Sequence, residues 1–307
     1  MGYTRREFGL MTVSGLALSG LALPARALAD TIVGGVRIGV QTYSFRELAR
    51  TPGGDATAAI IAAMTNTGLT ECELFAPQIE PASGLGRGAT ADERQKAREA
   101  VRRWRLETPL DHFRGIRKQF ASAGLSIAAY NTSPDASYTD EEIDRGFEIT
   151  KALGAGFITS STTLAVAKRI VPFAAKHKTT VAMHNHSNTS DPNEFATPES
   201  FAAALKMSPY FKVNLDIGHF TAANYDAVAY LREYHSYVSN LHLKDRKKNQ
   251  GDNVAWGQGD TPITQVLQLL KKEKWPVRAY VEYEHKGEAG AVAEVRTCFD
   301  YVKRALA

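Results

Sequence analysis

The sequence predicts an α/β protein folded as a single (β/α)8 barrel. Eight short apolar runs alternate with stretches of helical periodicity from residue 36 to the end of the chain, and such alternation is typical of parallel βα units. Eight units between residues 30 and 307 also match the length of one barrel. Gly68, Gly124 and Gly154 each follow a helical stretch and precede an apolar run, where a glycine that ends a helix is expected.

The apolar runs are predicted to be strands. In chain order they cover residues 36–42, 69–75, 125–130, 156–160, 179–184, 211–216, 238–243 and 278–284. Side chains alternate along a strand, so only one parity in each run can face the mouth of the barrel. In a parallel barrel the mouth lies at the C-terminal ends of the strands.

The connections between the strands are predicted to be helices. Helical patterns cover residues 55–66, 91–105 with 110–123, 140–153, 164–177, 198–207, 225–234, 262–272 and 290–306. The second connection is longer than the others, and its residues 77–90 are rich in glycine and proline, which predicts a loop over the mouth. Asp260 precedes the helix that starts at Pro262 and is expected to cap it.

Residues 1–29 are predicted to be an export signal. A twin-arginine pattern at residues 4–10 is followed by an apolar run at 10–23 and by Ala27-Leu28-Ala29, a cleavage pattern. We therefore expect a barrel domain over residues 30–307, periplasmic or otherwise exported by the twin-arginine route. The apolar run is short for a membrane span, so no stable insertion is expected after cleavage; an uncleaved anchor is the alternative.

Composition and charge narrow the classes of partner. The chain has 307 residues, 44% of them hydrophobic and 23% charged, which is ordinary for a globular protein. The net charge of the whole chain is +4. Residues 1–29 contain three arginines and one glutamate and so contribute +2, which leaves +2 for residues 30–307. That is no electrostatic footprint for nucleic acid, so a small molecule is the expected partner. Homo-oligomerisation stays open.

Four consecutive runs end in polar residues of one parity. These are His184 with His186, Asn214 with Asp216, His242 with Lys244, and Glu282 with Glu284. All are expected to reach the same rim of the barrel. Carboxylates and imidazoles that meet there would suit a divalent metal such as Mn, Co, Fe or Zn. Taken alone, Asp216 could equally be the N-cap of a helix.

Four motifs carry a resemblance to a known family: residues 215–219 (LDIGH), 241–245 (LHLKD), 257–260 (GQGD) and 281–284 (VEYE). Over the whole chain after the signal, the sequence resembles the sugar phosphate isomerase/epimerase family, also called xylose isomerase-like TIM barrels. That family includes ketose 3-epimerases, inosose dehydratases and, more distantly, apurinic endonucleases. The resemblance implies one divalent metal, most often manganese, held after strands five to eight. Asp216, His242 and Glu282 match the last three ligand positions.

The chain departs from the family at the first ligand position, where the family has Glu-Asn-His and this chain has His184-Asn185-His186. His184 could be a metal ligand, a base or both, or hold a hydrogen bond in the core. The family's two glutamates are also its acid/base pair, so this change argues against symmetrical epimerisation by two carboxylates. Glu282 is expected to move the proton. Lys244 either stabilises an oxyanion or forms a salt bridge with a rim carboxylate.

Five further residues are predicted to contact the substrate. Glu73 lies near the end of the second run and could bind a hydroxyl group or act as a second base. His186 and His219 could contact the substrate or only order their neighbours. Tyr43 could contact it or pack within a loop, as could Gln41, a weaker candidate at the end of the first run. Trp256 could stack on a sugar face or pack in the core.

The sequence leaves three functions open. The first is a metal-dependent isomerase or epimerase that acts through an enediolate on an unphosphorylated keto- or aldo-sugar. The second is a metal-dependent lyase or hydrolase of 3-keto-glycosides, and the third is a non-catalytic periplasmic sugar-binding protein. Residues 257–260 could offer backbone N–H groups to an anion. Asp260 would repel a phosphate, however, so an unphosphorylated substrate is expected.

Overall fold

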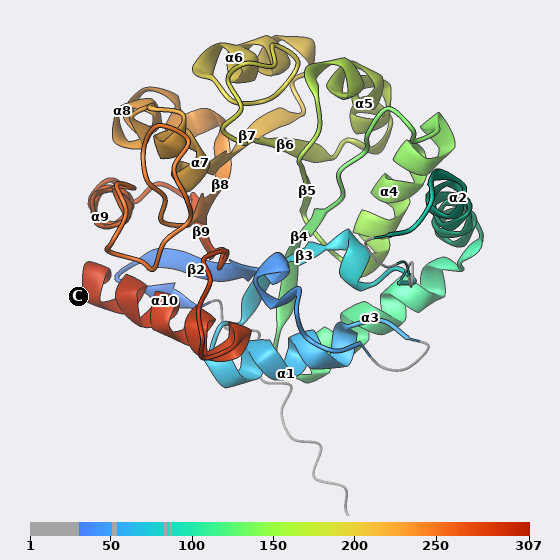
Figure 1. Cartoon of the computed structure of the whole chain (residues 1–307), viewed down its shortest axis with the longest axis horizontal. Coiled ribbons are helices and arrows are strands. Elements are labelled where there is room, and N and C mark those ends of the chain that lie inside the picture. The colour runs from blue at the N-terminus through green and yellow to red at the C-terminus, as the bar shows by residue number, and fades with distance from the viewer. Residues whose placement is uncertain (1–30, 51–53, 83–84, 86–87) are drawn as a thin grey trace, which may run out of the picture.

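The structure is a computed structural model that describes residues 31–50, 54–82, 85 and 88–307. Within them, eight parallel strands form a closed ring with helices around it (Figure 1). Strands β2 to β9 pair in sequence order, and β9 pairs with β2 to close the ring. The predicted single (β/α)8 barrel is confirmed. The predicted export signal, residues 1–29, lies outside the described residues.

Each predicted apolar run contains one strand of the barrel. The strands are β2 (Val36–Gln41), β3 (Glu71–Phe75), β4 (Ser126–Asn131), β5 (Phe157–Ser160), β6 (Thr180–His184), β7 (Phe211–Asp216), β8 (Val238–Leu243) and β9 (Arg278–Val281). β9 ends three residues earlier than predicted, so Glu282 and Glu284 lie on the segment that leaves the barrel. The sequence does not predict β1 (Ile32–Val33), which pairs antiparallel with the start of β2. Gly34 and Gly35 form the turn between them, both with positive φ.

Helices fill the connections between the strands. They are α1 (Thr57–Thr67), α2 (Ala91–Glu107), α3 (Leu110–Ser122), α4 (Asp140–Leu153), α5 (Leu164–His177), α6 (Pro198–Met207), α7 (Ile217–Ala222), α8 (Ala227–Tyr234), α9 (Ile263–Glu273) and α10 (Ala291–Leu306), with the 3-10 helices η1 (Thr42–Phe45), η2 (Ala76–Gln78) and η3 (His235–Tyr237). Gly68 and Gly154 end α1 and α4 in the left-handed conformation, as predicted. Every helix of the described part is too short or too polar to span a lipid bilayer.

The structure differs from the sequence prediction at two helix starts. The helix α7 follows β7 directly, and the side chain of Asp216 caps it by accepting from the His219 N–H. Six residues with two aromatic or imidazole side chains show too little periodicity for this helix to stand out in the sequence. The prediction that Asp260 caps α9 is wrong, because α9 begins after Pro262 without a side-chain cap. Asp260 instead accepts a hydrogen bond from the Lys248 N–H.

The interior of the barrel near its mouth is polar. One apolar core joins strands to the surrounding helices, whereas the side chains that meet inside the ring form a hydrogen-bonded network. The buried members of this network are Gln41, Glu73, Asn131, Thr159, Asn214, Asn240 and His242. Buried polar groups need hydrogen-bond partners, so a satisfied network of this kind holds each side chain in a fixed place.

A candidate metal centre

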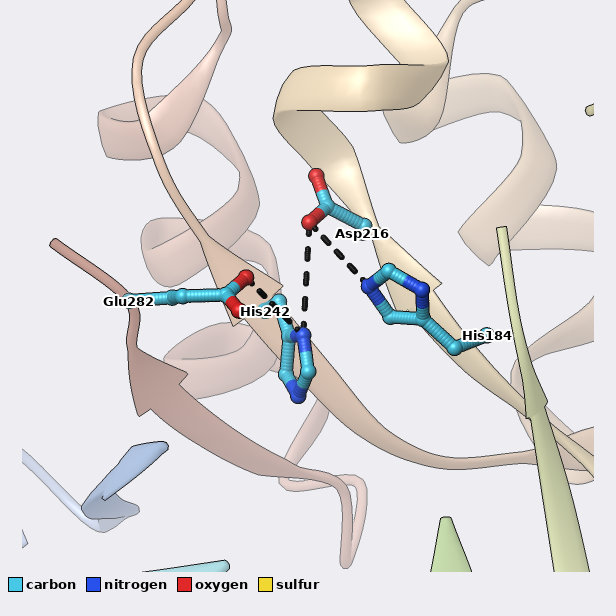
Figure 2. Close-up of side chains that lie close together, drawn as sticks. All are labelled: His184, Asp216, His242 and Glu282. Carbon is cyan, nitrogen blue, oxygen red and sulfur yellow. Dashed lines mark ion pairs between the residues drawn. The ribbon is translucent and has the colours of Figure 1, made fainter. Parts of the chain in front are cut away.

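Four side chains converge at the C-terminal ends of neighbouring strands. His184 ends β6, Asp216 ends β7, His242 lies near the end of β8, and Glu282 follows β9 (Figure 2). Each offers one ligand atom, and these atoms all lie within 4.8 Å of one another. All four side chains are buried. The predicted ligands therefore come together in space, although they are up to 98 positions apart, from residue 184 to residue 282, in the chain.

The facing atoms of this cluster have no hydrogen-bond partner among the described residues. They are His184 Nε2, Asp216 Oδ2, His242 Nδ1 and Glu282 Oε2. Leaving one buried polar atom unsatisfied costs about 1–3 kcal/mol, so four of them turned toward one point need a common partner. Two imidazole nitrogens and two carboxylate oxygens are a suitable ligand set for zinc, and also for manganese, iron or cobalt. The residues present fit a divalent metal.

The other atoms of these side chains are held in place. His184 Nδ1 lies 3.0 Å from Ser161 Oγ, which orients the ring. Asp216 Oδ1 accepts from the His219 N–H at 2.7 Å. The sequence predicted Asp216 to be either a metal ligand or the N-cap of a helix. The two roles are compatible, because one oxygen caps α7 while the other faces the cluster. Such partners commonly fix the orientation of a metal ligand.

His242 is oriented by Glu73, which lies beneath the cluster. His242 Nε2 donates to Glu73 Oε2 at 2.9 Å, because a carboxylate can only accept. A proton on Nε2 leaves Nδ1 as the ring atom that can coordinate a cation. Without a cation, burial lowers the pKa of His242, but the carboxylates of Glu282 and Glu73 outweigh it and raise the pKa well above its ordinary value. Nδ1 lies 3.0 Å from Glu282 Oε2.

The prediction that Glu73 contacts the substrate is corrected by its position. The side chain is fully buried, and both oxygens are occupied. Five side chains donate to it: Gln41, Asn131, Thr159, Asn240 and His242. Glu73 is better described as the residue that sets the tautomer of His242.

Lys244 forms salt bridges with carboxylates at the rim, which is one of the two roles predicted for it from the sequence. Its Nζ lies 3.0 Å from Asp216 Oδ2, 2.8 Å from Glu282 Oε2 and 2.6 Å from Glu284 Oε2. Burial alone lowers the pKa of Lys244, but these carboxylates outweigh it and raise the pKa. The side chain is therefore a permanently charged, buried ammonium. Only glycine fits at position 218, because a Cβ there would overlap Lys244.

Electrostatics keep two members of the cluster ready to bind a cation. Burial lowers the pKa of His184 to about 4, so its ring is neutral at neutral pH. Burial raises the pKa of Asp216, but the positive charge of Lys244, together with the neighbouring imidazoles, outweighs this effect and lowers the pKa well below its ordinary value. A neutral imidazole and an ionised carboxylate are the forms that coordinate metals.

A cavity of about 210 Å³ opens directly over the cluster. Tyr43, His186 and His219 line it, together with three of the four cluster residues, Lys244 and Glu284. Gln41, Phe75, Asn131 and Ser161 complete the lining; of these, the sequence indicated only Gln41, as a weak candidate. Phe75 and Asn131 end strands β3 and β4, and Ser161 directly follows β5, so strand ends were the signal that could have found them.

His186 and His219 are both engaged by charged neighbours at the wall of the cavity. His186 Nδ1 lies 2.8 Å from Glu194 Oε1. Arg246 donates to His219 Nδ1 at 2.6 Å, which leaves the Nε2 proton of that ring available. Trp256 does not line the cavity; its ring packs edge-on against Tyr301 of α10. Of the two roles considered for Trp256, the structure shows packing against the core.

Backbone N–H groups of the motif at residues 257–260 bind a carboxylate side chain of the same protein. The Asp245 carboxylate accepts from the N–H groups of Gly257, Gly259 and Thr261 at 2.7 to 3.2 Å. A Cβ at position 259 would overlap this carboxylate, which explains the glycine there. These amides are not available to a phosphate, and the loop from 246 to 260 is instead tied down beside the mouth.

The chain was also compared with known proteins. A family model described as xylose isomerase-like TIM barrel matches residues 37–301. No curated protein matches the chain.

Similar solved structures include one of a sugar phosphate isomerase/epimerase from Parabacteroides distasonis, with 18% identity and a TM-score of 0.56, covering 91% of this chain and 97% of that one. Another, of L-ribulose 3-epimerase, has 12% identity and a TM-score of 0.63, covering 88% and 94%. A third, of IOLI protein with a binding zinc atom, has 13% identity and a TM-score of 0.60, covering 88% and 97%. At these identities the likeness shows a shared fold.

Proposed function

This chain belongs to the xylose isomerase-like TIM barrel family, and from that premise we propose that it is a metal-dependent enzyme that isomerises or epimerises an unphosphorylated keto- or aldo-sugar. The observation that carries the proposal is the set of four unsatisfied buried atoms that face one another below a cavity. The cavity of about 210 Å³ is smaller than the roughly 300–1,000 Å³ typical of pockets for drug-sized ligands. It suits one sugar unit.

The residues around the cavity have separate roles in this proposal. A divalent ion held by His184, Asp216, His242 and Glu282 would supply a Lewis acid that draws charge onto a substrate oxygen and makes the neighbouring C–H acidic. Glu282 accepts and returns that proton. Burial raises the pKa of Glu282, but His242 and Lys244 outweigh it and lower the pKa, so the carboxylate is ionised at neutral pH.

Lys244 and His184 complete the proposed chemistry. The Lys244 ammonium lines the cavity and places a positive charge where negative charge develops on the substrate. His184 has a neutral ring that lines the same cavity, and it can take a proton only where its Nε2 is not coordinating the metal. Tyr43, His186 and His219 offer hydroxyl and imidazole groups for hydrogen bonds to sugar hydroxyls.

A second function is favoured by the uneven placement of acid/base groups. The carboxylates that line the cavity, Glu282 and Glu284, both come from the segment after β9. The side formed by β6 carries imidazoles instead. A one-sided arrangement suits removal of the C2 proton of a 3-keto-glycoside with loss of the C1 substituent, which makes the enzyme a lyase or hydrolase.

Both proposed reactions require a bound divalent metal, so the metal content of the protein tests them together. Protein purified after native export would be analysed by mass spectrometry for bound metals, with His242→Ala as the matched variant. We expect about one equivalent of Mn, Co, Fe or Zn in the native protein and loss of it in the variant. A metal-free native protein, with a folded variant that binds sugar equally well, would instead favour the sugar-binding protein.

Solvent isotope exchange separates the two reactions. In deuterium oxide, an isomerase or epimerase incorporates deuterium at the carbon next to the carbonyl and returns a rearranged sugar. A lyase releases an aglycone from a keto-glycoside and does not rearrange free keto-sugars. Glu282→Gln should abolish either reaction, and turnover without any exchange would contradict both schemes.

Export by the twin-arginine route is a separate part of the proposal. It rests on residues 4–29 of the sequence. Replacing Arg5 and Arg6 by lysine should keep the protein in the cytoplasmic fraction of its host, and unchanged periplasmic recovery would contradict this route.

A further inference from the structure

A second cavity lies between α2 and the segments that follow β3 and β4 at the rim of the barrel. Its volume is about 670 Å³, roughly three times that of the cavity over the cluster, and within the roughly 300–1,000 Å³ range of ligand pockets. Figure 1 shows α2 on the outside of the ring, next to α4. The functions considered above make no use of this space.

One face of α2 forms the outer wall of this arginine-lined cavity. The lining residues of the helix are Arg94, Ala97, Arg98, Val101, Arg102 and Arg105. Their spacing of three and four residues places them on one side of the helix. A helix that covers a barrel normally buries such a face, yet α2 has no buried residue. Guanidinium groups and small apolar side chains stand where packing would be expected.

The cavity carries an excess of positive charge. Its lining contains five arginines, with Arg50 added to the four of α2, and three acids, Glu80, Asp135 and Glu142. Arg105 pairs with Glu80 and Glu142, and Arg102 pairs with Glu142. These pairs neutralise the floor of the cavity.

The remaining arginines give the cavity its net charge. Arg50 donates to the backbone carbonyls of Pro77 and Glu80, and Arg98 donates to the side-chain oxygen of Gln95. These acceptors are neutral, whereas Asp135 is close enough to Arg98 to interact with its charge. Arg50, Arg94 and Arg98 together therefore leave an excess of positive charge over Asp135, the remaining acid of the lining.

The two cavities are separated by the segments that follow β3 and β4, and residues two positions apart in these segments line different cavities. Phe75 lines the cavity over the cluster and Pro77 the arginine-lined one. Asn131 and Ser133 are divided in the same way. Two residues of extended chain span at most about 7 Å. In addition, the Ser161 N–H donates to Ser133 Oγ at 2.9 Å, so residues that line the two cavities are in direct contact. The separation between the cavities is therefore within the length of a ligand of two units.

We propose that the arginine-lined cavity binds the second unit of the substrate and that this unit carries a carboxylate. The proposal rests on the proposed sugar chemistry of the neighbouring site and extends it, because the natural substrate would then be an acidic sugar conjugate and not a free monosaccharide. Prolines 77 and 81, Ala97 and Val101 offer apolar surface to the body of that unit. Arg50 and Arg98 face its carboxylate. The unit can be a uronic acid or an aromatic acid, since both present a carboxylate on a compact ring.

Equilibrium binding to the metal-loaded full chain tests the proposal without requiring turnover. Titration calorimetry would compare two matched pairs of probes: glucosyl-(1→4)-glucuronate with cellobiose, and 4-carboxyphenyl glucoside with phenyl glucoside. We expect the acidic member to bind at least about tenfold more tightly, as one charge-assisted hydrogen bond provides, and the difference to shrink in 0.5 M salt. The pair with the larger ratio identifies the kind of acid. Equal affinity within both pairs would overturn the proposal.

A pair of variants on α2 locates the effect. Arg98→Gln removes an exposed guanidinium of the lining, whereas Arg103→Gln removes an exposed guanidinium of the same helix that does not line the cavity. Only Arg98→Gln should lose the tenfold preference, and it should bind the neutral probes and metal as before. Equal loss in both variants would show a general charge effect and contradict the assigned site.

Two further measurements distinguish failure of the proposed binding site from failure of the proposed reaction. Binding of free glucuronate or 4-hydroxybenzoate to the metal-free His242→Ala variant tests the arginine-lined cavity apart from the metal centre, and it should persist in that variant. A protein that binds these acids through Arg98 yet shows no proton exchange would keep this site and lose the proposed reaction. A protein that exchanges protons but shows no preference for acidic probes would lose this site only.

Discussion

The ammonium nitrogen of Lys244 lies 2.8 Å from Oε2 of Glu282. That oxygen is one of the four atoms assigned to the metal, and Asp216 Oδ2, a second one, is 3.0 Å from the same nitrogen. The lysine thus supplies an internal positive charge to the oxygens that would bind the ion. Its one hydrogen bond of good geometry goes to Glu284, at 2.6 Å, which offers it an alternative partner outside the cluster.

Replacing Lys244 by methionine should therefore strengthen metal binding and weaken the metal-free fold. The metal-free variant leaves two buried carboxylates without their counter-ion, and loss of one partner of a buried ion pair costs about 3–5 kcal/mol. Affinity for Mn²⁺ or Zn²⁺ should rise by about tenfold or more, because repulsion between two nearby cations amounts to several kcal/mol. Calorimetry and metal-dependent thermal shifts measure both effects. Lys247→Met, on the exposed loop, is the control, and an unchanged affinity in the Lys244 variant would contradict the expectation.

Replacing Glu73 by glutamine should weaken metal binding without touching the metal site directly. The amide no longer fixes the proton of His242 on Nε2 as a carboxylate does, and loss of such a partner typically costs about 10–100-fold in metal affinity. Glu71→Gln is a matched control, because Glu71 is also buried on β3 but contacts Arg278 and Tyr280. Competition with a fluorescent chelator measures the affinities. If both variants lose affinity equally, the effect is general damage to the barrel.

The stability of the metal-free protein should fall as the pH falls from about 6.5 to about 4. Burial lowers the pKa of His184 to about 4, whereas an unfolded histidine has a pKa of about 6.5. Between these values only the unfolded chain takes up the proton, so acid favours unfolding, by roughly 3 kcal/mol in total. Urea unfolding at pH 7 and 4.5, with a chelator present, measures this loss. The loss of stability between pH 7 and 4.5 should be smaller in His184→Gln. It should be unchanged in His112→Gln, which alters an exposed histidine.

Replacing Asp245 by alanine should release the loop of residues 246–260. Three backbone N–H groups lose a charged acceptor, and hydrogen bonds to charged groups contribute about 1.5–3 kcal/mol each. We expect a loss of roughly 3 kcal/mol or more in the free energy of unfolding, and new protease cleavage within the loop. Asp252→Ala, at an exposed position of the same loop, should change neither. Protection of the loop in the Asp245 variant would show that other contacts hold it.

Much of the site followed from periodicity alone. In a parallel barrel the C-terminal ends of all strands meet at one rim, so a polar residue of the right parity at a strand end must lie there. His184, Asp216, His242 and Glu282 met this condition, and the structure brings their ligand atoms together. Whether they hold a metal stays a prediction. Tyr43, His186 and His219 also reached the cavity, because they lie within three residues of a strand end.

Predictions that depended on where a side chain points beyond the strand were less successful. Trp256 lies on a long connection, and its ring turned toward α10. Glu73 has the parity of a rim residue, but it lies one layer down, where five donors surround it. Parity states which face of the sheet a side chain occupies and says nothing of its height along the barrel axis.

The sequence by itself determined the number and order of the strands, the ends at which the polar residues gather and the type of ligand they offer, because these properties depend on local periodicity and residue chemistry. Only the tertiary structure decided that four of those atoms lack a hydrogen bond of good geometry within the described part of the chain, that Lys244 lies among them, and that a face of α2 encloses a charged cavity beside the mouth. Each of these depends on side chains separated by tens of residues, whose distances are set when the ring closes.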